Sequence, residues 1–203
     1  MSIIAFAKHA AFALLVGTTL TGTANAQAVR DTVSRNRWEF MMSSGALVGT
    51  GAQRGVIKDA PLSTAQVSYV IGSRFAVTAT TGWARSRDIA SSGNPKLDVF
   101  TYDVGAELRA PRQNAESKIA FTPLVGAGVG ARSYNYRNLD VGASHNLATY
   151  AALGGEMGVR RVLLRFEVRD YVTRFAPLVG DGGSTTRNDL VAMLGLRLVR
   201  RGS

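Results

Sequence analysis

The sequence predicts an all-β fold, an eight-stranded antiparallel up-and-down transmembrane β-barrel. Three observations lead to this prediction. The 203-residue chain begins with an export signal, and its remainder contains no run of about 18 apolar residues that could form a transmembrane helix. That remainder carries eight segments in which apolar and polar residues alternate, separated by clusters of Gly, Pro, Asn, Asp and Ser. A sheet that meets lipid must close on itself, because lipid cannot satisfy the hydrogen bonds of an open edge.

Residues 1–26 are expected to form a cleaved secretory signal peptide. A basic start that ends at Lys8 leads into the apolar residues 10–16, and small residues follow up to an Ala-x-Ala motif that ends at Ala26. The alternative is a transmembrane anchor, which needs about 20 apolar residues, and Gly17 interrupts the apolar run well before that length. Cleavage would leave Gln27 as the first residue of a single barrel domain, 27–203.

Composition limits the partners of the exported chain. It keeps 23 basic and 14 acidic residues, a net charge of +9, and this balance often indicates nucleic acid or anionic lipid. Export argues against nucleic acid, and the bases are scattered, as solvated loop and rim charges would be. The chain has no Cys, so it lacks the disulfides of many small exported domains, and a closed sheet in lipid would supply stability by other means.

The first four segments already show the two faces of a barrel wall. They span residues 38–48, 64–71, 75–85 and 100–109. Only Gly72, Ser73 and Arg74 separate the second from the third, as in a tight hairpin. The fourth segment alternates most regularly, with apolar residues at even positions from 100 to 108 and the charged Asp103 and Glu107 opposite them. A face with such charges cannot be the core of a soluble sandwich.

The last four segments repeat the pattern over residues 121–133, 148–157, 162–173 and 189–199. Pro123 belongs near a strand start, because proline cannot donate to the sheet ladder. Residues 158–161 form a short turn. The long connections, roughly ten or more residues rich in Gly, Ser, Asn and Asp, follow the first, third, fifth and seventh segments, and two of the three other connections are very short. This alternation of connection lengths predicts an up-and-down meander with long loops at one end.

Aromatic residues are expected to form two girdles at the membrane surfaces. One girdle lies near the short-turn end and the other near the long-loop end. From residue 75 to residue 83, the strand rises about 20 Å along the barrel axis at a tilt of ~40°, close to the ~25 Å apolar band. The predicted members are Trp38, Phe40, Tyr69, Phe75 and Phe121 at the turn end and Trp83, Phe100 and Tyr102 at the loop end.

Several phrases resemble those of the small eight-stranded outer-membrane barrel proteins of the OmpA-like and OmpX-like kind. They are Tyr102-Asp103-Val104-Gly105-Ala106-Glu107, Val125-Gly126-Ala127-Gly128-Val129-Gly130 and Leu164-Arg165-Phe166-Glu167-Val168-Arg169. The resemblance covers nearly all of the exported chain and implies the outer membrane of a Gram-negative cell, with the barrel assembly machinery as a partner. Such proteins usually end their last strand with an aromatic residue, which this chain does not have after Leu198.

If the apolar faces contact lipid, the opposite faces point into the lumen and bring ten charges together. Buried charges persist only when paired and hydrogen-bonded, and five acids face five bases, so we expect a neutral ionic network. Eight strands enclose a space that side chains can fill, which favours a plug over an open pore. The predicted network consists of Glu39, Asp103, Glu107, Glu156, Glu167, Arg109, Arg132, Arg165, Arg169 and Arg197.

The sequence contains no pattern that indicates catalysis, a metal site or a cofactor. His145 follows Ser144, but adjacent residues on an expected loop do not form an oriented nucleophile and base. Residues 126–130 are rich in glycine, yet they lack the spacing, the helix and the Lys of a phosphate-binding loop. Asp181 and Asp189 do not have the spacing of a calcium loop. We therefore predict a protein that is not an enzyme.

Three functions remain open from the sequence. The first is a monomeric structural or surface-interaction barrel in the cell envelope, whose partners are outer-membrane lipid and, through bases of the long loops, lipopolysaccharide. The second is a small-solute channel, which the lumen charges disfavour. The third is a soluble periplasmic ligand-binding barrel, which would need an apolar lumen and a polar exterior. The bases considered for lipopolysaccharide are Arg54, Lys58, Arg85, Arg87 and Arg137.

Overall fold

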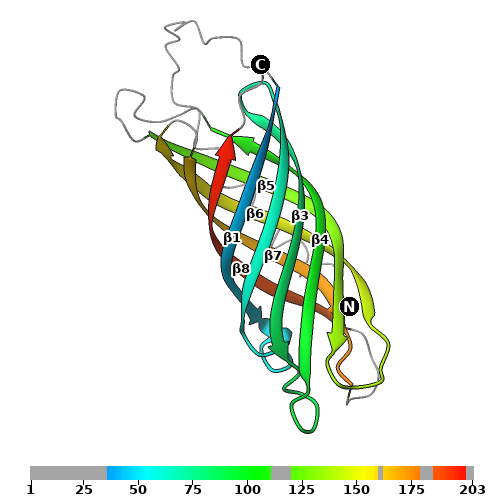
Figure 1. The fold of residues 1–203 in the computed structure, drawn as a ribbon. Helices are drawn as coiled ribbons and strands as arrows, with labels where there is room; N and C mark the ends of the chain where they lie inside the picture. Colours follow the sequence, from blue (N-terminus) through cyan, green and yellow to red (C-terminus); the bar gives the residue numbers. More distant parts are fainter. Residues whose placement is uncertain (1–35, 111–119, 160–161, 179–184, 200–203) are drawn as a thin grey trace, which may run out of the picture. The chain divides into compact units, whose positions relative to one another are not determined.

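Eight antiparallel strands follow one another along the chain and close into a barrel in the computed structural model (Figure 1). The structure describes residues 36–110, 120–159, 162–178 and 185–199, so the expected signal peptide, with Ala26 and Gln27, lies outside the described residues. None of the helices in these ranges is long and apolar enough to span a membrane. The elements are β1 (Arg37–Thr50), η1 (Gly51–Gln53), β2 (Ala60–Ile71), β3 (Phe75–Arg87), β4 (Lys96–Arg109), β5 (Ala120–Tyr136), β6 (Ser144–Val159), β7 (Val162–Phe175) and β8 (Thr185–Val199).

The first and last strands close the sheet. β1 pairs with β8 from Glu39 opposite Val199 to Thr50 opposite Asn188, and Figure 1 shows the blue β1 beside the red β8. Each of the other strands pairs with its neighbours in chain order. No strand is left with an open edge, which is the condition for a sheet in lipid. The predicted eight-stranded antiparallel up-and-down barrel is confirmed.

Side chains along the strands alternate between the lumen and the exterior, because successive residues of a strand point to opposite faces. In β3, exposed and buried residues alternate without interruption from Phe75 to Arg87. Met42 is 76% exposed and Leu198 is 58% exposed, which is unusual for apolar side chains of a water-soluble protein. We call the outward apolar side chains the apolar belt; among them are Phe40, Met42, Val67, Val77, Val104, Leu108, Val125, Val129, Leu153, Phe166, Val168, Leu194, Leu196 and Leu198.

All eight strands extend two to four residues beyond their predicted limits at the end where β1 joins β2 and β3 joins β4, here called the loop end. β4, for example, begins at Lys96 and β8 at Thr185. The connections at this end are therefore seven to nine residues long, shorter than predicted. The strands continue because the ladder of backbone hydrogen bonds does not depend on apolar residues facing outward. At the opposite end two connections are short, but the ten residues between β4 and β5 form the longest connection of the barrel.

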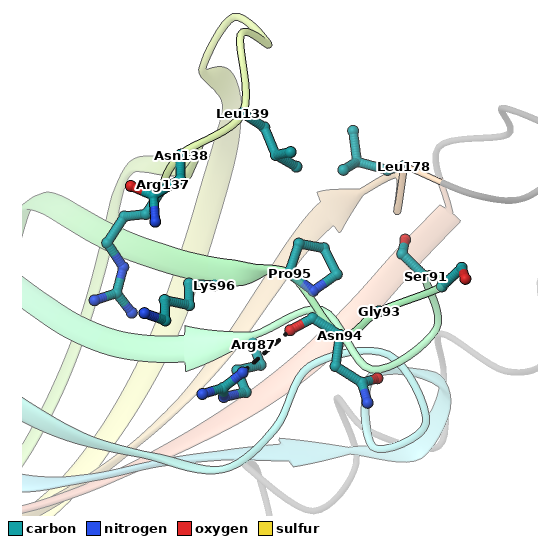
Figure 2. A pocket seen from close by; sticks show the side chains of 11 residues that line it. Arg87, Ser91, Gly93, Asn94, Pro95, Lys96, Arg137, Asn138, Leu139 and Leu178 are labelled. Carbon is teal, nitrogen blue, oxygen red and sulfur yellow. Dashed lines mark hydrogen bonds between the residues drawn. The ribbon is translucent and has the colours of Figure 1, made fainter.

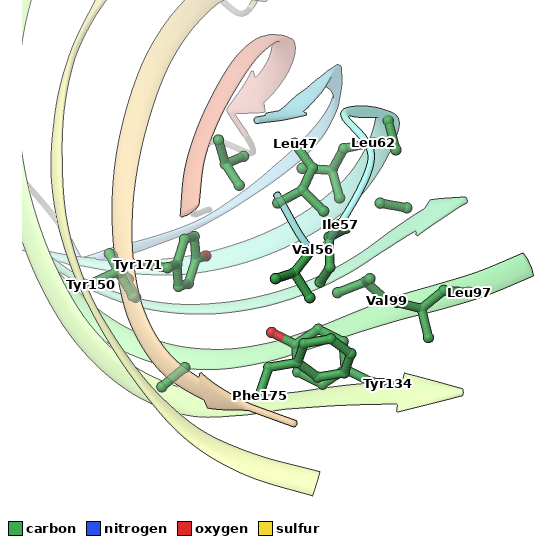
Figure 3. Close-up of a cluster of buried hydrophobic side chains, with 14 of the residues drawn as sticks. Leu47, Val56, Ile57, Leu62, Leu97, Val99, Tyr134, Tyr150, Tyr171 and Phe175 are labelled. Carbon is green, nitrogen blue, oxygen red and sulfur yellow. The ribbon is translucent and has the colours of Figure 1, made fainter. Parts of the chain in front are cut away.

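The polarity of the wall reverses in these strand extensions. Leu97 and Val99 point inward and are fully buried, while Lys96 on the same strand faces outward and is exposed. Inside the loop end the rings of Tyr134 and Phe175 lie 4.3 Å apart, measured between centroids. Figure 3 shows the resulting apolar core, here called the mouth cluster, which consists of Leu47, Val56, Ile57, Leu62, Leu97, Val99, Tyr134 and Phe175. At this level the barrel has the apolar interior and polar exterior of a water-soluble protein.

The connection between β1 and β2 folds into this mouth. Its residues Val56 and Ile57 are buried in the mouth cluster. The backbone N–H groups of Val56 and Ile57 both donate to the Gln53 carbonyl, at 2.9 and 3.1 Å. The segment is tied to the next loop, since Ile89 N–H donates to the Val56 carbonyl at 2.8 Å. Residues 51–59, here called the mouth segment, therefore cover the interior at the loop end.

Candidate functional site

Six charged side chains form a closed ring across the lumen. The guanidinium of Arg109 bridges Glu39 Oε2 at 2.9 Å and Glu107 Oε2 at 3.1 Å. Arg165 contacts Glu107 Oε1 at 2.6 Å and Glu156 Oε1 at 3.1 Å. Arg197 completes the ring, because it pairs with Glu156 and donates to Glu39 Oε2 at 2.8 Å. The contact between Arg165 of β7 and Glu107 of β4 joins strands that lie on different sides of the barrel.

A second group of charges continues from this ring toward the mouth. Glu167 pairs with both Arg165 and Arg169. Arg169 contacts Asp103 Oδ2 at 3.4 Å, and the Tyr171 hydroxyl donates to the same oxygen at 2.5 Å. Gln66 links the two groups, since its amide donates to Glu107 Oε1 at 3.0 Å and its oxygen accepts from Arg169 at 2.7 Å. We call the ring and this continuation the lumen network.

The side chain of Tyr150 fills the space that glycines leave on the two neighbouring strands, β5 and β4. A Cβ atom on Gly128 would lie 2.5 Å from Tyr150 Cε1, and one on Gly105 would lie 2.2 Å from the Tyr150 hydroxyl. The Tyr150 ring lies against these two strands, and the Arg169 guanidinium lies 4.7 Å from its centroid. Such cation–π contacts add to the stabilisation of a guanidinium. The small residues thus make room for an aromatic ring inside the barrel.

The ten charges predicted for the lumen are all buried on the inner face, each no more than 6% exposed. The structure brings nine of them into the lumen network. Arg132 is the exception, because its Nη1 pairs with Asp189 Oδ2 at 2.7 Å and its guanidinium lies over the Tyr171 ring. Arg132 therefore joins the network only through an aromatic contact.

Sequence reasoning missed two inner charges at the loop end, Asp189 and Arg187. Both lie on the face opposite Leu190. The period of two already placed Asp189 inside, within the predicted segment 189–199, whereas Arg187 lies inside only once β8 is extended to Thr185. Arg187 donates to the carbonyls of Phe175 at 3.1 Å and Ala52 at 2.7 Å, which anchors the mouth segment. Asp88 was also missed, because its loop has no periodicity; it accepts from the Tyr136 hydroxyl at 2.6 Å.

The eight predicted girdle residues occupy the outer face near the expected ends of the barrel. At the turn end the rings of Trp38 and Tyr69 lie 4.9 Å apart, between centroids. Phe121 stacks on Phe166, which was not predicted, at 6.1 Å. At the loop end Trp83 lies directly opposite Phe100 in the register of β3 and β4. The remaining predicted members, Phe40, Phe75 and Tyr102, are each more than one third exposed.

The serine and histidine considered for catalysis do not form a pair. Ser144 and His145 lie in β6, so the prediction that they lie in a loop was wrong. Adjacent residues of a strand point to opposite faces, which separates their side chains, and Ser144 accepts a hydrogen bond from Asn146 at 2.9 Å. Within the described ranges, no three His, Cys, Asp or Glu side chains are grouped in a way that could hold a metal ion.

Comparison with known proteins identifies the fold. No protein-family model and no curated protein sequence matches the chain. The chain is similar in structure to Neisserial surface protein A, with a TM-score of 0.55 and 10% identity over 83% of this chain and 99% of that one. It is also similar to the outer membrane protein OprG from Pseudomonas aeruginosa, with a TM-score of 0.51 and 13% identity over 83% of this chain and 99% of that one. The chain therefore has the fold of the small eight-stranded outer-membrane β-barrels.

Proposed function

We propose that the protein is a monomeric outer-membrane barrel with a plugged lumen, which serves a structural or surface-interaction role in the cell envelope. The observation that carries this proposal is the ring of Glu39, Arg109, Glu107, Arg165, Glu156 and Arg197, which joins opposite walls of the lumen. A water-filled pore needs a continuous polar path, and these side chains occupy that path. The mouth cluster and the mouth segment form a second, apolar closure above the ring.

The immediate partner in this proposal is membrane lipid, which would solvate the apolar belt. The aromatic girdle residues would mark the two membrane surfaces, where amphipathic rings are favoured. Lipopolysaccharide is a further candidate at the loop end, because Arg54, Lys58, Arg85 and Arg87 are exposed there. Delivery to the membrane would require the barrel assembly machinery. We assign no catalytic role and no cofactor.

Recording ionic current across planar bilayers tests the plug. Purified full-length protein, checked for the mobility shift of a folded barrel on unboiled gels, is added to the bilayer beside a general porin as a positive control. We expect no steady current from the folded protein, because both closures block the lumen. Steady conductance in the nanosiemens range would instead assign the small-solute channel function.

A soluble periplasmic ligand-binding barrel is the other alternative from the sequence. Its exterior would have to be polar over the whole wall, whereas Met42, Leu194 and Leu196 are each more than half exposed. Its lumen would have to be apolar, whereas Arg165 and Glu107 lie at its centre. The large apolar cluster of the interior lies at the mouth. These observations support membrane embedding over the soluble alternative.

A further inference from the structure

We propose that a row of three bases on the outer wall, Arg87, Lys96 and Arg137, binds the phosphate groups of a glycolipid headgroup in the surrounding leaflet. The inference rests on the proposed membrane embedding. Arg87 ends β3, Lys96 begins β4 and Arg137 directly follows β5. We call these residues the basic row.

The three positive charges lie side by side at the ends of neighbouring strands. Arg87 is directly opposite Lys96 in the β3–β4 register. The Arg137 backbone N–H donates to the Lys96 carbonyl at 2.9 Å, which places these two residues side by side. Strands are spaced about 4.8 Å apart, and like charges directly opposite each other destabilise an antiparallel pair. An anion bound at the row would convert this repulsion into attraction.

The protein neutralises only part of this charge. Asp98 Oδ1 lies 3.3 Å from Arg137 Nε. Arg87 donates to the Asn94 carbonyl at 3.4 Å, which is a neutral acceptor. Among the described residues, no carboxylate lies within ion-pair distance of Arg87 or Lys96. Two of the three bases therefore keep their charge available for an outside ligand.

Two adjoining hollows flank the row, and all three bases line both. One, of about 400 Å³, is shown in Figure 2; Asn94 and Asn138 supply amide groups there, and Leu139 supplies an apolar surface. The other, of about 360 Å³, adds Lys58 and Arg85 and one carboxylate, Asp59, so that five bases face a single acid there. Guanidinium and ammonium groups bind phosphate through charge-assisted hydrogen bonds, while the amides can bind sugar hydroxyls. The hollows thus fit a phosphorylated sugar better than an apolar ligand.

The height of the row points to a lipid headgroup as the source of the phosphate. Arg87 lies four residues beyond Trp83, about 13 Å along the strand and about 10 Å along the barrel axis. Aromatic girdles lie at the level of the headgroups, so the row faces the outer part of that layer. Its residues are on the side wall, and Arg85 lies over the Trp83 ring at 4.5 Å, continuing the basic surface down to the girdle.

The test measures binding of diphosphoryl lipid A to the full-length protein folded in neutral detergent. The row variant R87Q/K96Q, which removes the two bases without a carboxylate partner, is compared with the control variant R74Q/R174Q, which loses the same two charges at exposed positions away from the row. Because each base contributes a charge-assisted hydrogen bond, we expect the row variant to bind roughly tenfold or more weakly. The control should change by less than about twofold, and monophosphoryl lipid A should bind wild type more weakly than the diphosphoryl form.

Three outcomes would overturn the proposal. Equal weakening in both variants would mean that only net charge matters, and unchanged binding in the row variant would remove the site. Tighter binding of a soluble heparin fragment than of lipid A at the same row would replace the lipid headgroup with a free glycan. The mobility shift on unboiled gels reports separately on the barrel itself, so its absence in wild type would count against the proposed function and not against the row.

Discussion

At the residue scale, the lumen network is stabilised by carboxylates that each contact two guanidiniums. Glu39 accepts from Arg109 and Arg197, and Glu107 accepts from Arg109 and Arg165. Removing a charge from water costs several kcal/mol per ion, about as much as a good partner returns. A ring in which every ion has two partners of opposite sign offsets this cost better than an isolated pair would. Loss of one member should therefore affect the whole ring.

We predict that Glu107→Gln destabilises the barrel by about 3–5 kcal/mol, because it removes one carboxylate partner from each of two buried charges, Arg165 and Arg109. The free energy of unfolding in urea, followed by tryptophan fluorescence in lipid vesicles, measures the change. Asp140→Asn, at an exposed loop position, removes the same charge and should cost less than about 0.5 kcal/mol. Equal values for the two variants would mean that the ring contributes no stability.

The sequence could predict which residues point inward but not which of them touch. Alternation alone placed Glu107, Glu156 and Arg165 on the inner face, since the direction of a side chain in a strand depends only on its position along that strand. Which acid meets which base depends on the stagger of strands across the lumen, and that stagger is set by closure. The contact of Tyr150 with Gly105 and Gly128 could not be predicted either, because it depends on the register of three strands.

At the scale of the elements, each strand has two zones that differ in which of its faces is apolar. In the belt its apolar side chains face outward, and near the mouth its apolar side chains face inward. This reversal explains why the predicted strands stopped short of the loop end. For example, the fourth strand was predicted to begin at residue 100, whereas β4 begins at Lys96. Hydrophobic alternation predicts a strand only while one face stays apolar. The burial of the mouth segment could not be predicted from alternation either, because Val56 and Ile57 lie between strands.

We predict that Ile57→Ala loosens the mouth while the belt stays intact. The side chain is 2% exposed, and such truncations cost about 2–5 kcal/mol where the site cannot collapse. Amide hydrogen exchange should quicken roughly tenfold or more at Lys58 and Ile89, which bond across the mouth segment, and remain unchanged at Val104. Val141→Ala, at a loop position that is 44% exposed, is the matched control. Faster exchange throughout the barrel would contradict a separate mouth unit.

At the scale of the whole molecule, the barrel combines an apolar exterior with a charged interior over most of its height. That combination is stable only where lipid replaces water outside, because the exposed belt would otherwise favour aggregation. The fold class followed from the sequence because eight segments carried the same alternation of apolar and polar residues and most of the connections alternated in length. Nothing in these patterns could specify the second, apolar closure at the mouth.

We predict that Ala79→Arg costs about 2–4 kcal/mol in lipid vesicles, because Ala79 faces outward midway between Phe75 and Trp83. Asn135→Arg, which is exposed in the reversed zone, should cost only about 0–1 kcal/mol. Unfolding by guanidinium chloride in vesicles measures both. In a soluble barrel both positions would be wetted and both changes would stay within about 0.5 kcal/mol, so equal small effects would refute membrane embedding.

The reversal of polarity along the wall also fixes the vertical position of the barrel in its membrane. Suppose that the barrel moved along its axis by one residue pair, roughly 5 Å, with the loop end going toward the membrane centre. The side chains of Arg85 and Lys96 would then approach hydrocarbon, where a charged group is costly. A slide the other way would lift the rings of Trp38 and Phe40 into the core and expose apolar wall to water. Since both displacements are penalised, a bilayer of unsuitable thickness must stretch or thin around the protein. The lipids, and not the barrel, would make the adjustment.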